Sequence, residues 1–65
     1  DLMAALEQLL PSQRDVIMMK YFDGLSPMEI AQKLGKNVKA VYSLQFRSIQ
    51  DLRKNLANNR DKLNE

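Results

Sequence analysis

Five residues between positions 39 and 47 combine positive charges, hydroxyl groups and aromatic rings in a pattern suited to nucleic-acid recognition. Lys and Arg donate hydrogen bonds to guanine or to phosphate, Ser and Tyr hydroxyls bond to either, and Phe can contact a thymine methyl group or a sugar. If the segment is helical, all five lie within an arc of roughly 140°, because a helix turns about 100° per residue. The five are Lys39, Tyr42, Ser43, Phe46 and Arg47.

The opposite side of the same segment can pack against a protein core. Val41, Leu44, Ser48 and Leu52 cluster there by the same arithmetic. The sequence therefore predicts an amphipathic helix that begins after Asn37, a good N-cap residue, and continues to about residue 56.

Positive charge is concentrated around this helix. Residues 32 to 54 hold six Lys or Arg residues against one Asp, a net of +5, whereas residues 1 to 31 have a net of −3. A basic block on a small domain is typical of a protein that binds a polyanion. A solvated helix face would give the same count, so charge alone does not decide between the two.

A shorter helix must hold the basic helix in place. Ser26, Pro27 and Glu29 form a capping-box pattern that predicts a helix start, and Gly35 predicts its end. Small Ala31 allows close crossing and Gly35 allows a tight turn, which is typical of a helix-turn-helix. The expected core of this motif is Ile30, Ala31, Leu34, Gly35, Val41 and Leu44, and Lys36 and Asn37 of the turn join the candidate DNA-binding set.

The whole chain is predicted to be all-α, a bundle of four to five helices without a wing. Further helices are expected over residues 2–9, with Leu2, Leu6 and Leu9 on one stripe, and over residues 12–22. The second helix should bury Val16, Met19 and either Tyr21 or Phe22. The methionines Met3, Met18, Met19 and Met28 are expected to fill the core, and the polar end, residues 57–65, is expected to fray.

Composition excludes most site chemistry. The 65 residues include no Cys and no His, and no nucleophile with a base, metal-ligand set or phosphate loop is visible, so we expect no enzyme, metal or cofactor. No apolar run approaches the roughly 18 residues of a membrane span, and we expect a cytoplasmic, monomeric domain. The chain opens at Asp1 rather than Met, so it is interpreted as a single domain, ordered over about residues 2–56, from a longer protein.

The chain resembles region four, the C-terminal promoter-reading domain, of bacterial sigma-70 family factors of the extracytoplasmic-function type. The resemblance rests on residues 5–11, 14–16, 21–26, 29–31, 34–35, 40–48 and 52–53. It implies a helix-turn-helix that reads the minus-35 promoter element and touches the flap of the polymerase β subunit. The resemblance also allows an anti-sigma factor as a partner. Region two of such factors is absent from the chain.

The residues at the family's contact positions are those on the outward arc, but three positions depart from its pattern. Tyr42 and Leu44 stand where cations are frequent, and Phe46 stands where His is frequent. The preferred promoter sequence therefore cannot be transferred from the family. Two alternatives stay open: the DNA-binding domain of a LuxR-type response regulator, and a sigma-like module that binds proteins.

Overall fold

The structure, a computed structural model, describes the backbone of residues 2–63 and the side chains of residues 2–58. Its elements are α1 (Leu2–Glu7), α2 (Pro11–Ile17), the π-helix η1 (Met18–Phe22), α3 (Pro27–Leu34) and α4 (Val38–Leu63). The described residues contain no strand, which confirms the all-α prediction. The first helix ends two residues earlier than expected.

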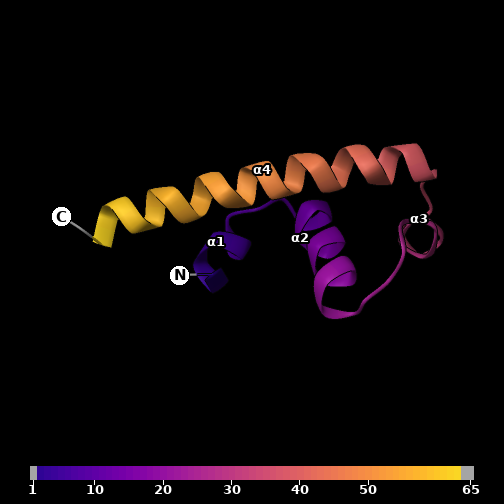
Figure 1. The fold of residues 1–65 in the computed structure, drawn as a ribbon, viewed down its shortest axis with the longest axis horizontal. Coiled ribbons are helices and arrows are strands. Elements are labelled where there is room, and N and C mark those ends of the chain that lie inside the picture. The colour runs from indigo at the N-terminus through magenta and orange to yellow at the C-terminus, as the bar shows by residue number, and fades with distance from the viewer. Residues whose placement is uncertain (1, 64–65) are drawn as a thin grey trace.

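Helix α4 runs the length of the domain, and the other helices pack against it (Figure 1). Its 26 residues span about 39 Å, close to the 43 Å length of the whole molecule. Helices α1, α2 and α3 all lie on one side of it, which leaves the other side open to solvent. The predicted fraying of residues 57–65 stays a prediction: α4 continues to Leu63, and residues 64 and 65 lie outside the described residues.

Two apolar clusters seat α4 on the other helices. The first, near the start of α4, holds the buried residues Val16, Ile30, Ala31 and Val41, with Met19, Leu25, Leu34 and Leu44 packed against it. The second joins α1 and α2 to the middle of α4 through Leu6, Leu9, Ile17 and Leu52. Burial in both clusters fixes the rotation of α4 about its axis, and hence the side that faces solvent.

The ends of α3 follow the sequence prediction. Ser26 Oγ accepts a hydrogen bond from the backbone N–H of Glu29 at 3.2 Å, and Glu29 Oε1 accepts one from the backbone N–H of Ser26 at 2.9 Å. Gly35 ends the helix with a left-handed φ of 65°, which a residue with a Cβ adopts at a cost. Because both ends of α3 are fixed, the direction in which the chain enters α4 is fixed too.

The capping box makes the stability of the domain depend on pH. Hydrogen bonds from the backbone and side chain of Ser26 lower the pKa of Glu29 below its ordinary value of 4.5, and Lys33 adds to the effect. A lowered folded-state pKa means that the stabilisation is present above pH 4.5 and is lost as the pH falls through the folded-state pKa. We expect Glu29→Gln to remove this part of the acid sensitivity, as measured by urea unfolding between about pH 3 and 6.

Replacing the capping hydroxyl tests the same feature at neutral pH. Ser26→Ala should lower the free energy of unfolding by about 1 kcal/mol, because the Glu29 N–H loses its acceptor. Ser43→Ala, at an exposed position inside α4, is the matched control and should change stability by less than about 0.5 kcal/mol. Equal effects of the two substitutions would contradict a capping role.

A π-helix ends the second helical segment, where a regular α-helix over residues 12–22 was predicted. The backbone N–H of Asp23 bonds to the carbonyl of Met18 at 3.0 Å, a five-residue spacing that widens the turn. The wider turn carries Tyr21 and Phe22 to the surface, so the prediction that one of them is buried is wrong.

Three of the four methionines and one leucine also lie outside the expected core. Met3, Met18 and Met28 are exposed, and only Met19 packs against the first cluster. Leu2, expected on the inner stripe of α1, is exposed as well. The first helical segments therefore leave apolar side chains uncovered.

Two polar contacts join segments far apart in the chain. The buried Gln13 donates a hydrogen bond from Nε2 to Asp51 Oδ2 at 2.7 Å, and its Oε1 accepts one from the Leu10 N–H at 3.1 Å. Further along α4, Asn55 Nδ2 donates to the Ala5 carbonyl at 3.1 Å. These contacts tie α1 and α2 to the second half of α4.

Candidate nucleic-acid interface

The start of α4 is fixed by its cap and by the helix before it. Asn37 Oδ1 accepts a hydrogen bond from the Ala40 N–H at 2.8 Å, which closes the first turn. One turn later, the fully buried Val41 packs between α2 and α3. The Asn37 cap and the buried Val41 together fix which residues of α4 face outward.

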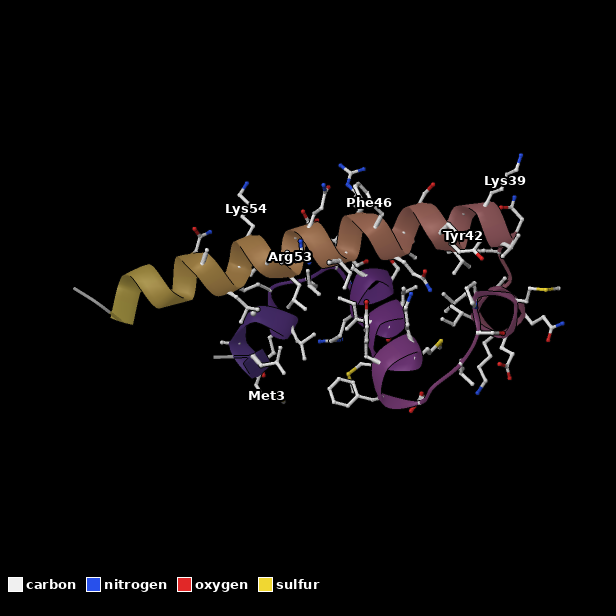
Figure 2. All side chains as sticks on the ribbon, viewed as in Figure 1. Met3, Lys39, Tyr42, Phe46, Arg53 and Lys54 are labelled. Carbon is white, nitrogen blue, oxygen red and sulfur yellow. The ribbon has the colours of Figure 1, made fainter. Side chains whose placement is uncertain are left out.

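The structure places all five residues of the predicted arc on the exposed side of α4. Figure 2 shows Lys39 and Phe46 projecting from the side of α4 that no other helix covers. The Phe46 side chain is 67% exposed and Tyr42 is 57% exposed. We call this set the reading face; it comprises Lys39, Tyr42, Ser43, Phe46 and Arg47.

The remaining candidate residues lie at the turn and beneath the reading face. Lys36 and Asn37 are exposed in the turn before α4. Among the residues expected to hold the helix-turn-helix together, Ile30, Ala31 and Val41 are buried, and Leu34 and Leu44 are half-buried against them.

Sequence reasoning missed the extension of the exposed face along α4. Gln50, Arg53 and Lys54 are also exposed, and Figure 2 shows Lys54 on the same side as Lys39. Continuing the rotation of about 100° per residue past Arg47 would have found them. They lengthen the cationic surface by about two helical turns.

Acidic charge is sparse along this stretch. Asp51 is the only carboxylate between residues 38 and 54, and it lies half-buried on the inner flank, bonded to Gln13. Lys39, Arg47, Arg53 and Lys54 outnumber it four to one along the exposed side, and only Arg47 lines the same hollow as Asp51. Such a surface attracts phosphate by displacing its counterions.

A shallow groove of about 470 Å³ runs between α4 and η1 beside the reading face. Aromatic rings of Tyr21, Tyr42 and Phe46 line it, with Lys20 and Arg53 also contributing charge. Its inner side includes Gln45, whose buried Nε2 has no hydrogen-bond partner within the described residues. Ser48, by contrast, is buried with its Oγ donating to the Leu44 carbonyl at 2.6 Å.

Neither a metal cluster nor a membrane span is found in the described part of the chain. No group of three or more acidic residues there is arranged to hold a metal ion. None of the described helices has both the length and the apolar character needed to cross a bilayer.

Comparison with known proteins identifies the family to which this chain belongs. The model of the family described as "Sigma-70, region 4" matches residues 1–52, which is most of the chain and includes α3, the turn and α4 as far as Leu52. The chain belongs to the sigma-70 region 4 family. It is therefore a sigma-factor DNA-binding domain, of a family whose members are not enzymes.

One curated relative supports the extracytoplasmic-function subgroup. This region 4 domain is 35% identical over 51 residues to "ECF RNA polymerase sigma factor BldN" of Streptomyces coelicolor (strain ATCC BAA-471 / A3(2) / M145). The match covers 78% of this chain and 19% of the relative, so the chain spans about a fifth of that protein. No solved structure matches the chain.

Proposed function

We propose that this domain reads the minus-35 promoter element by placing the reading face of α4 in the major groove. The proposal rests on one observation: all five side chains are exposed along one side of a helix that two apolar clusters hold in place. A major groove is about 12 Å wide and admits one α-helix. Lys36 and Asn37, at the entrance to α4, are then positioned to contact the phosphate backbone.

The charge arrangement supports DNA over an uncharged partner. Lys39 and Arg47 lie about two turns apart on the exposed side, with hydroxyl groups between them. Cations at both ends of the reading face suit phosphates or guanine edges, and hydroxyls suit the bases between.

Removing the two cations tests the proposal. Lys39→Ala and Arg47→Ala should each weaken binding to a promoter duplex by about tenfold at low salt, the cost of one good charged contact. The logarithmic slope of affinity against salt concentration should fall by about 1 for each phosphate that the variant no longer neutralises. Fluorescence anisotropy at several salt concentrations measures both quantities.

Arg14→Ala is the matched control, because Arg14 is exposed on α2 beside α1 and away from the reading face. It removes the same charge and should change the affinity far less. If both reading-face variants bound the duplex as the parent does at low salt, the proposed reading face would be wrong.

A second proposed contact is with the β flap of RNA polymerase, on the apolar surface left by α1 and η1. Leu2, Met3, Met18 and Phe22 are exposed there, and an adjoining hollow of about 250 Å³ is lined by Leu2, Leu6, Ile17, Tyr21, Phe22, Ile49 and Leu52. Exposed apolar groups in one patch mark a protein contact.

The same NMR sample separates the two contacts. Duplex should shift the amide signals of Lys39, Ser43 and Arg47, whereas a flap peptide should shift those of Met3 and Phe22. An anti-sigma factor would be identified as a protein that shifts one of these two sets of amide signals and competes with the duplex or the flap peptide that binds there.

A further inference from the structure

We infer that Phe46 makes this domain a reader of thymine methyl groups, so that its preferred site carries thymine under the middle of α4. The inference rests on the proposed function and adds to it the identity of a recognised base. It also names the side chain that discriminates that base from cytosine.

The ring of Phe46 lies outside the apolar core of the domain. It belongs to neither apolar cluster and is 67% exposed, although it is one of the largest apolar side chains in the chain. A Phe that is two-thirds exposed adds little to folding, since the apolar contribution comes from area removed from water. The ring is therefore available for contact with a partner outside the chain.

Phe46 stands inside the reading face, among side chains that suit bases. Ser43 and Gln50 lie one turn to either side of it, and Lys39 projects in nearly the same direction two turns earlier, about 10 Å along the axis. Sugars and phosphates form the walls of a major groove, whereas base edges form its floor. A ring in the middle of the face meets the floor.

The floor of the major groove offers one apolar partner. Guanine, adenine and cytosine present hydrogen-bond donors and acceptors there, and only thymine adds a methyl group. Phe has no donor or acceptor, so it gains nothing from the other three edges. Tyr42, one turn before Phe46 and 57% exposed, adds a second ring on the same flank.

Selection from a random duplex library is the first test. The parent should enrich thymine at one or two positions, and Phe46→Ala should lose that preference while keeping the others. Phe22→Ala, which removes a similarly exposed ring on η1, is the matched control and should select the same sequences as the parent. Circular dichroism checks that each variant is folded.

Base analogues then isolate the methyl group. Replacing the selected thymine by deoxyuridine removes only that methyl and should weaken binding by the parent about fourfold, the effect of burying one such group. Phe46→Ala should bind the two duplexes equally. Placing 5-methylcytosine where cytosine stands at that position should strengthen binding by the parent by a similar factor.

The outcomes distinguish this inference from the proposed function. A parent protein that selects a sequence yet binds every deoxyuridine duplex as tightly as the thymine duplex overturns the inference alone. An identical selection by the parent and Phe46→Ala also overturns it, and assigns the ring to a protein contact. A parent that selects no sequence and shows no salt-dependent binding overturns both.

Discussion

Replacing Ile30 by alanine is expected to remove about half of the free energy of unfolding of the domain. Ile30, on α3, is fully buried against α2 and α4. Truncation of such a residue costs about 2–5 kcal/mol, part of it for the cavity left behind. A domain of 65 residues has a total stability of only about 3–10 kcal/mol, so the loss consumes much of it.

Urea unfolding followed by circular dichroism measures this loss. Met28→Ala, two residues earlier on α3 and exposed, is the control and should change stability by less than about 0.5 kcal/mol. The loss of unfolding free energy for Ile30→Val should fall between those of the other two variants, at about 1 kcal/mol. Similar unfolding midpoints for Ile30→Ala and Met28→Ala would show that the first cluster does not support the fold.

Gln13→Ala should have the second largest effect. Its side chain bonds both to the Leu10 N–H and to the Asp51 carboxylate, and the residue is buried. A hydrogen bond to a charged group contributes about 1.5–3 kcal/mol and a neutral one about 1 kcal/mol, so we expect a loss of about 2–4 kcal/mol. The same denaturation experiment measures it, with Gln32→Ala on the exposed side of α3 as control.

A double-mutant cycle isolates the bond between the two helices. Asp51→Ala should itself destabilise, and combining it with Gln13→Ala should cost less than the sum of the two, because the shared bond can be removed only once. Strict additivity would mean that the 2.7 Å hydrogen bond contributes nothing to stability.

The parts of the fold that follow from local rules were predictable from the sequence. The capping box at Ser26 and the turn at Gly35 depend on a few neighbouring residues, and the structure has both ends of α3 where these residues place them. The exposed side of α4 follows from one rotation angle applied to one uninterrupted helix. The described structure has Val41 and Phe46 on opposite sides of that helix, as the rotation requires.

The parts that depend on a change of helical pitch or on distant contacts were not predictable. The π-turn after Ile17 shifts the phase of every later residue in that segment, so a period of about 3.6 residues wrongly buries Tyr21 and Phe22. The bond between Gln13 and Asp51 joins residues 38 positions apart, and nothing local to either residue indicates it. The role of the reading face remains a prediction, because exposure shows availability rather than use.

Because α4 is one continuous helix, the domain is a single rigid body. From Val38 to Leu63 the helix is unbroken, and contacts along its length hold α1, α2 and α3 in fixed orientation to it. If the two proposed contacts form, a protein bound to the apolar surface of α1 and η1 also sets the angle at which the reading face meets DNA. Once one of these two contacts has formed, the second forms at a high effective concentration. Each contact can therefore be weak alone, and the two together still select one docking geometry.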